Sequence, residues 1–124
     1  MLKKQGSRVH ATGPASRDIQ AIVEWTIEKF GEAAARRYQR LIWQAFRDIG
    51  LDPELLGSKP CPESNFDGVR TYHLKMSRTK VAGSRVKNPR HLVAYWRRGD
   101  GEVEVLRILH DGSDIKRHLN DIAP

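Results

Sequence analysis

The sequence is poor in cysteine, has no long apolar segment, and has fewer acidic than basic residues. Cys61 is the only cysteine in 124 residues, so no intramolecular disulfide can form, as is typical of proteins from a reducing compartment. No apolar run approaches the roughly 20 residues of a membrane-spanning helix, and Met1-Leu2-Lys3-Lys4 is not followed by an apolar signal segment. These absences predict a soluble, cytoplasmic protein with no membrane partner.

The sequence also lacks the residue spacings typical of metal sites. His110, Asp111 and Asp114 could meet one cation, but stabilisation of a turn around Gly112 explains them more simply. Cys61 lies between two prolines with no base nearby in sequence, which predicts an inert thiol. We therefore expect neither a metal nor a cofactor. The histidines, none of them at a zinc-ligand spacing, are His10, His73, His91, His110 and His118.

The excess of positive charge favours an acidic partner. Lys and Arg number 22 against 15 Asp and Glu, giving a formal net charge of +7. Nucleic acid, the ribosome and an acidic protein all fit this charge. Residues 75–88 are basic without one acidic residue, and Gly83 and Ser84 within them predict an extended, mobile loop. With Arg90, Arg97 and Arg98 this loop could bind phosphates, the alternative being a merely solvated surface.

The C-terminal half has the pattern of a β-hairpin followed by a helix. Residues 91–97 are rich in β-branched and aromatic side chains, and residues 102–109 alternate between polar and apolar. Between them, Arg98-Gly99-Asp100-Gly101 predicts a turn in which both glycines are free to adopt positive φ. Ser113 or Asp114 is placed to cap a short helix over residues 115–122.

The N-terminal half predicts a short strand and two helices. Residues 1–7 should be a frayed tail and residues 8–12 an edge strand. Pro14 suits the first turn of a helix that ends at Gly31, and a second helix follows at residues 32–49. Two helices joined by one glycine must double back as a helical hairpin. The expected apolar faces are Ile19, Ile22, Val23, Thr26, Ile27 and Phe30 in the first helix and Ala34, Tyr38, Leu41, Ile42, Ala45, Phe46 and Ile49 in the second.

The middle of the chain predicts a loop and a third strand. Residues 50–68 contain three prolines, and Leu55 and Leu56 are expected to anchor them to the core. Residues 69–74 alternate as a strand does. Core packing is the favoured role of Trp25 and Trp96. Trp43 is out of phase with its helix, which predicts an exposed partner contact.

Both halves resemble the ParE branch of the RelE/ParE toxin superfamily. The N-terminal half carries D-I-x-x-I-x-x-W-T at residues 18–26 and F-G-E-A-A-A-R-R-Y at residues 30–38. The resemblance implies one α+β domain over residues 1–124: an N-terminal helical hairpin packed on a small, twisted antiparallel β-sheet, with a short C-terminal helix. The matching residues of the C-terminal half are Tyr95, Asp100, Gly101, Val105, Leu106, Arg107, Leu109, His110 and Asp114.

The resemblance implies a plasmid-stabilising toxin of a type II toxin–antitoxin system, neutralised by an acidic antitoxin of ParD type and directed against DNA gyrase. Two alternatives remain: a RelE-like, ribosome-dependent mRNA endonuclease, and an inactive member that only binds antitoxin. The RelE branch uses an arginine after the last strand and a tyrosine near the C-terminus, but here these positions read Ser113 and Leu119. The expectation is therefore a toxin that is not an enzyme. The nuclease alternative would rely on Lys87, Arg90, Arg107 and His110.

Two surfaces are predicted to bind partners. Trp43 lies outside the apolar face of its helix, and together with Arg36 and Arg40 it is expected to contact the antitoxin. The C-terminal side is expected to bind the target, because its basic loop can order on an acidic partner and the hairpin turn projects its arginines outward. Ile115, Leu119 and Ile122 would dock the last helix with its cations outward. The expected target-binding residues are Arg78, Lys80, Arg85, Lys87, Arg97, Arg98, Lys116 and Arg117.

Overall fold

A computed structural model describes residues 6–83 and 85–120. Most of the expected N-terminal tail, together with Ser84 and Ile122, lies outside the described residues. Within them no helix is long and apolar enough to cross a membrane. In chain order the elements are β1 (Val9–Ala11), α1 (Gly13–Phe30), α2 (Glu32–Leu51), β2 (Lys59–Pro60), β3 (Arg70–His73), the 3-10 helix η1 (Leu74–Lys80), β4 (His91–Arg97), β5 (Val103–His110) and α3 (Ile115–Asn120).

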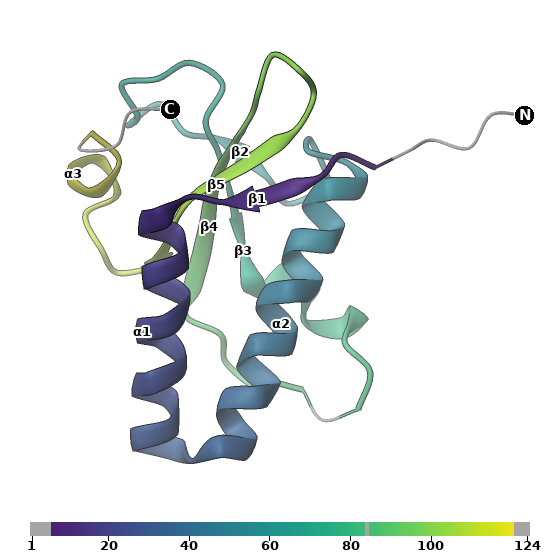
Figure 1. Cartoon of the computed structure of the whole chain (residues 1–124), viewed down its shortest axis with the longest axis vertical. Coiled ribbons are helices and arrows are strands. Elements are labelled where there is room, and N and C mark those ends of the chain that lie inside the picture. Colours follow the sequence, from purple (N-terminus) through teal and green to yellow (C-terminus); the bar gives the residue numbers. More distant parts are fainter. Residues whose placement is uncertain (1–5, 84, 121–124) are drawn as a thin grey trace, which may run out of the picture.

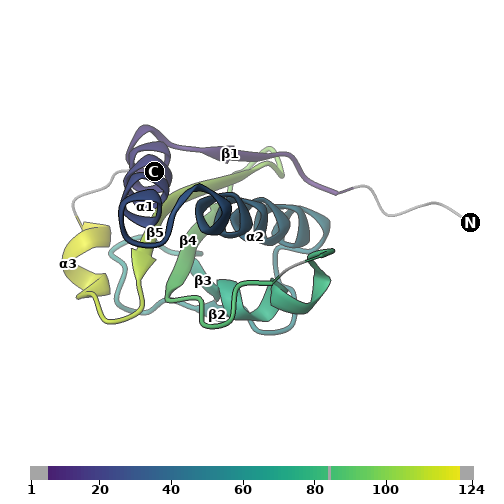
Figure 2. The ribbon, with the colours of Figure 1, turned by 90° about the horizontal axis from the view of Figure 1, so that it is seen from below.

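The strands form one sheet in the order β1-β5-β4-β3-β2 (Figure 1). The expected α+β class is confirmed, and so is the hairpin of β4 and β5. The sheet is mixed rather than wholly antiparallel, because β1 runs parallel to β5, with Val9 opposite Val103. The helical hairpin packs against one face of this sheet (Figure 2). The turn between β4 and β5 contains the two glycines that are free to adopt positive φ, and of these Gly101 does so, with a φ of 87°, whereas Gly99 does not.

The helical hairpin forms where the periodicity places it. The hydroxyl of Thr12 accepts the Ala15 N–H at 3.3 Å and caps α1, and Gly31, with a φ of 92°, separates the two helices. Ile19, Ile22 and Thr26 are buried as expected. Ile27 and Phe30 are 42% and 69% exposed, contrary to expectation. The reason is visible in Figure 1, where both helices extend beyond the sheet towards Gly31, so α1 has no sheet to pack on there.

Two apolar clusters lie on the two faces of the sheet. The larger one joins both helices to the inner side chains of β3, β4 and β5, and the smaller one contains Leu119 of α3 and Leu106 of β5. The β4–β5 register shifts between Ala94 and Tyr95, so that Ala94 lies opposite Arg107. Uninterrupted alternation along β5 would put Arg107 on the face of Val103 and Val105, and the register shift breaks that alternation.

The basic loop at residues 75–88 is more ordered than expected, since η1 occupies its first half. Buried Ser77 explains the helix: its hydroxyl donates to Asp48 Oδ2 on α2 at 2.6 Å and lies 2.7 Å from the Tyr72 hydroxyl. Charge and glycine content do not reveal this anchor. In the preceding connector Leu55 packs on the core as expected, but Leu56 is 92% exposed and anchors nothing.

Candidate functional site

A groove of about 920 Å³ lies where the helical hairpin overhangs the sheet. One wall is formed by the end of α1 and the start of α2, on either side of Gly31, and the other wall is the segment 85–90. His91 and His110 come from the adjoining ends of β4 and β5. Its size falls within the range of roughly 300–1,000 Å³ that is usual for binding sites. The lining residues are Trp25, Thr26, Phe30, Ala34, Arg37, Tyr38, Arg85, Val86, Lys87, Asn88, Arg90, His91 and His110.

The outer wall of the groove is aromatic. Trp25 was expected in the core, but its side chain is 54% exposed. Its indole meets the ring of Phe30 edge to face, with centroids 5.7 Å apart and an interplanar angle of 67°. Core packing therefore fails for Trp25, whereas Trp96 packs on the smaller cluster as expected. The overhang therefore leaves an aromatic pair facing solvent.

The inner end of the groove holds a half-buried polar pair. The Tyr38 hydroxyl lies 2.6 Å from His91 Nδ1 and accepts the backbone N–H of Arg90 at 3.1 Å. Burial raises the pKa of Tyr38 to about 12. Burial, assisted by the neighbouring His110 and His73, lowers the pKa of His91 from 6.5 to about 4. The pair is therefore neutral near pH 7 and joins α2 to the start of β4.

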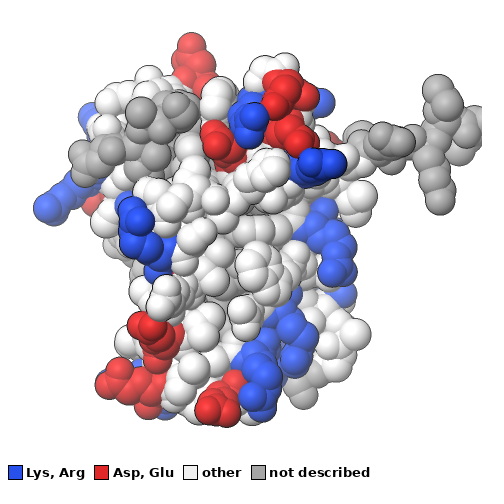
Figure 3. Space-filling view, viewed as in Figure 1, with Lys and Arg blue, Asp and Glu red and all other residues white. Residues whose placement is uncertain are grey.

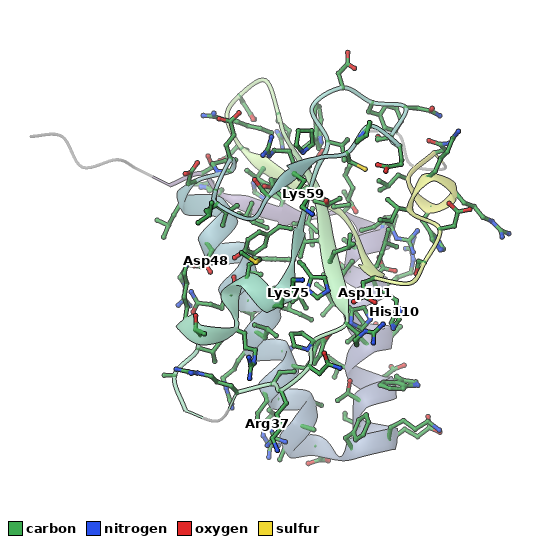
Figure 4. All side chains as sticks on the ribbon, turned by 180° about the vertical axis from the view of Figure 1, so that it is seen from behind. Arg37, Asp48, Lys59, Lys75, His110 and Asp111 are labelled. Carbon is green, nitrogen blue, oxygen red and sulfur yellow. The ribbon has the colours of Figure 1, made fainter. Side chains whose placement is uncertain are left out.

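Asp111 fixes the cations at this end of the groove. Its Oδ1 accepts from Arg90 Nε at 3.1 Å and Nη2 at 2.9 Å, and its Oδ2 lies 3.0 Å from His73 Nε2. The hydrogen bonds from His73 and Arg90 lower the pKa of Asp111 from 3.8 to about 2. His110 is exposed, and its ring packs edge to face on His91 at 5.5 Å. Figure 4 shows His110 and Asp111 at the end of β5.

The residues named for the nuclease alternative come together only in part. Lys87, Arg90 and His110 line the groove, but Arg107 does not. Its guanidinium donates to Asp18 at 2.6 Å and 2.9 Å, which makes it a structural link between β5 and α1. Leu119, at the position where the RelE branch has a tyrosine, is apolar and only 1% exposed, so it supplies no acid to the groove. Among the described residues no three His, Cys, Asp or Glu side chains are grouped to hold a metal ion.

The residues predicted to bind the target do not form one surface. Arg85 and Lys87 line the groove, while Arg97 and Arg98 lie at the opposite end of β4, where Arg98 pairs with Asp100 at 2.7 Å. Lys116 and Arg117 are exposed on α3. Two members have structural partners: Arg78 donates to the Val86 carbonyl at 2.7 Å, and Lys80 lies 3.6 Å from Asp48.

A second candidate surface runs along the outer face of α2. Arg36, Arg40, Trp43 and Arg47 are all exposed and recur at three- and four-residue spacing, which places them on one helical face. Figure 3 shows basic side chains along this helix. Trp43 is 44% exposed, as its phase predicted, and packs edge to face on Phe46 at 5.4 Å. We call these four residues the α2 outer stripe.

Sequence reasoning missed several residues of both surfaces. Arg47 was overlooked, although its spacing from Trp43 in the same helix was a sufficient signal. Helical periodicity predicted that Phe30 lies in the core, because periodicity indicates which face of a helix is apolar but not how far the sheet beneath it extends. Tyr38 and His91 are 53 positions apart, and nothing local indicates that they meet. Such pairs are visible only once the helical hairpin is placed on the sheet.

Comparison with known proteins agrees with the fold and with the resemblance. Residues 9–115 match the family described as ParE toxin of type II toxin-antitoxin system, parDE. A solved structure titled "Chromosomal ParDE TA system from P. aeruginosa" contains a chain that is similar, with a TM-score of 0.60 and 18% sequence identity. The match covers 84% of this chain and 95% of that one. Among curated proteins no match was found. Since the family match spans most of the sequence, the chain belongs to the ParE toxin family of type II toxin–antitoxin systems.

Proposed function

We propose that this ParE-family toxin acts in the cytoplasm as an inhibitor of DNA gyrase and is neutralised by an acidic antitoxin of ParD type that binds the α2 outer stripe. The observation that carries the antitoxin part is an exposed tryptophan set among arginines on one helical face. An indole supplies contact area at an interface, and the arginines attract and orient an acidic segment. A hollow of about 410 Å³ beside Trp43, lined also by Val9 and Leu51, extends the apolar area.

Co-expression with the small neighbouring gene tests the antitoxin site. We expect one complex in gel filtration for the unaltered pair, and loss of that complex for Trp43→Ala combined with Arg40→Glu. Lys116→Glu with Arg117→Glu is the matched control, because it removes exposed cations from α3 without touching α2. A complex that survives the α2 variant but not the α3 variant would place the antitoxin elsewhere.

For the target, we propose that the groove side of the molecule contacts gyrase through Arg85 and Lys87. Both are exposed and line the groove, whereas Arg78 and Lys80 hold the loop in place. Family membership supports the gyrase assignment. A supercoiling assay with purified gyrase tests it: the unaltered toxin should inhibit, and Arg85→Glu with Lys87→Glu should inhibit about tenfold less. Full inhibition by this folded variant would remove the two residues from the target site.

One observation favours a second candidate, the ribosome-dependent endonuclease. Lys87, Arg90 and His110 line the same groove, and an exposed imidazole beside cations could move a proton while they stabilise a phosphorane. Primer extension on translated mRNA separates the two functions. Codon-specific cuts that disappear in His110→Gln would establish the nuclease. Intact mRNA together with inhibited gyrase supports the gyrase proposal. If the protein neither cuts mRNA nor inhibits gyrase, it is a member of the family that only binds antitoxin.

A further inference from the structure

We infer that the groove between the helical hairpin and the segment 85–90 is a peptide-binding site, which accepts an acidic segment that inserts a bulky apolar side chain beside Trp25 and Phe30. This deepens the proposed target site by naming the chemistry of its ligand. For its biological meaning it rests on the proposal that this side of the molecule binds the target. The ligand chemistry itself is testable without gyrase or antitoxin.

The apolar requirement follows from the wall formed by the two helices. Trp25 and Phe30 are 54% and 69% exposed, next to Ala34 on the facing helix. Exposed aromatic surface of this kind is unfavourable in water, and free energy is gained when an apolar side chain covers it. The two rings are inclined at 67°, so they do not form one flat surface. We therefore expect a branched or aromatic side chain to cover both.

The acidic requirement follows from the charges around the groove. The described residues that line it include Arg37, Arg85, Lys87 and Arg90, and none of them is Asp or Glu. Arg90 is already neutralised by Asp111, but Arg85 and Lys87 are exposed on the wall opposite the helices. Carboxylates that flank an inserted apolar side chain would meet these cations. Charge complementarity therefore selects an acidic segment over a neutral or basic one.

Ring geometry favours a peptide over single-stranded nucleic acid. Bases stack on open aromatic faces. Here Trp25 and Phe30 are inclined at 67°, Tyr38 and His91 at 86°, and His91 and His110 at 87°, so that rings meet edges instead of forming parallel shelves. The Tyr38 hydroxyl is also engaged by His91 and by the Arg90 N–H, so it is not free to select a base.

Titration followed by amide NMR tests the inference on the whole chain. The probe is a synthetic ten-residue peptide with Asp and Glu on both sides of a central Leu-Phe pair. We expect saturable shifts at groove residues such as Thr26 and Val86. Replacing Leu-Phe with Ser-Ser in the peptide should weaken binding by at least about tenfold, because the inserted side chain is the anchor. A uridine hexanucleotide is the competing ligand class.

Variants of the protein localise the site. Trp25→Ala with Phe30→Ala should weaken the peptide by about tenfold or more while the fold persists, since both side chains are largely exposed. Leu56→Ala is the control: it removes a 92% exposed apolar side chain that is outside the groove lining and should change affinity less than about twofold.

Three results would overturn the inference. They are no shifts in the groove at about 1 mM peptide, equal binding of the Ser-Ser peptide, and tighter binding of the hexanucleotide than of the peptide. Failure of the gyrase assay alone would not be among them. Peptide binding without gyrase inhibition would keep the groove as a peptide site and reject the proposed target, so the two failures are distinguishable.

Discussion

At the scale of single residues, the groove is supported by titratable groups that are held far from their ordinary pKa values. His91 stays neutral because burial disfavours its charged form, and Asp111 stays ionised because Arg90 and His73 bond to it. Both groups tie stability to pH in the acid range. A histidine with a lowered pKa leaves the unfolded chain binding protons that the folded chain refuses, so stability falls as the pH falls.

The first prediction concerns His91. As pH falls from 6.5 to 4, the His91 effect should remove about 3 kcal/mol of stability, because its pKa is lowered to about 4. Asp111 contributes stability above pH 3.8 that is lost as the pH falls through about 2. His91→Gln keeps an acceptor for Tyr38 but cannot titrate. In urea unfolding across pH 4–7, the free energy of unfolding of this variant should therefore depend much less steeply on pH. An unchanged slope in this variant, equal to that of His10→Gln, would contradict the assignment.

The second prediction concerns Asp18, which joins elements that are distant in sequence. Its carboxylate accepts two bonds from Arg107 and the backbone N–H of Ile108 at 2.9 Å. Asp18→Asn should cost about 2–3 kcal/mol of unfolding free energy, because the half-buried guanidinium of Arg107 loses the negative charge of Asp18. The exposed pair of Glu32 and Arg36, 3.8 Å apart, supplies the control, and Glu32→Gln should change stability by less than about 0.5 kcal/mol. Equal effects in denaturant melts would show that Asp18 is not a special link.

At the scale of elements, the position of the basic loop depends on how η1 docks on α2. Asp48 is buried on α2 and receives the Ser77 hydroxyl, while Lys80 approaches the same carboxylate at 3.6 Å. Arg78 then reaches the Val86 carbonyl and ties η1 to the groove wall. The buried carboxylate of Asp48 thus holds η1 in place, and through Arg78 it also holds the groove wall around Val86.

The third prediction tests this anchor. Ser77→Ala removes the donor to Asp48 and leaves the buried Tyr72 hydroxyl without its serine partner, at a cost of about 1–3 kcal/mol. Because the loss is local, trypsin should cut faster after Arg78, Lys80 and Arg85 while the β4–β5 hairpin keeps its amide protection. Thr79→Ala, in the same turn but exposed, should behave like the unaltered chain. Uniform loss of protection over all elements would show global rather than local opening.

At the scale of the whole molecule, charge and contact area have separate tasks. The net charge of +7 sets the long-range attraction for an acidic partner, and its effect depends on ionic strength. Trp43 and the aromatic pair of the groove act only at contact. The α2 outer stripe and the groove lie on different walls of the helical hairpin, one turned away from the sheet and one facing the segment 85–90.

The fourth prediction follows from this separation. Raising the salt concentration from about 0.05 M to about 0.5 M should slow antitoxin association by roughly tenfold or more and change dissociation less, because screening weakens steering. Trp43→Ala should instead speed dissociation and leave the salt dependence of association intact. Surface plasmon resonance measures both rates. Salt-independent association would argue that the charge does not steer this partner.

The sequence by itself determined the elements whose cause is local. Helical periodicity and Gly31 specified the two helices, and alternation with a glycine turn specified the β4–β5 hairpin, because these signals lie within a few residues of one another. It also indicated Trp43 as exposed, since one helix suffices to define a phase. The periodicity of the helix could not show that α1 overhangs the sheet, and it therefore placed Ile27 and Phe30 in the core.

Only the tertiary structure decided the groove and its supports. The bonds between Tyr38 and His91 and between Asp18 and Arg107 span 53 and 89 positions. The order of η1 depends on Asp48, 29 positions before Ser77. A register shift in the β4–β5 pair places Arg107 opposite Ala94. Burial and pairing depend on which elements meet and where each one ends, and these are properties of packing rather than of any short stretch of chain.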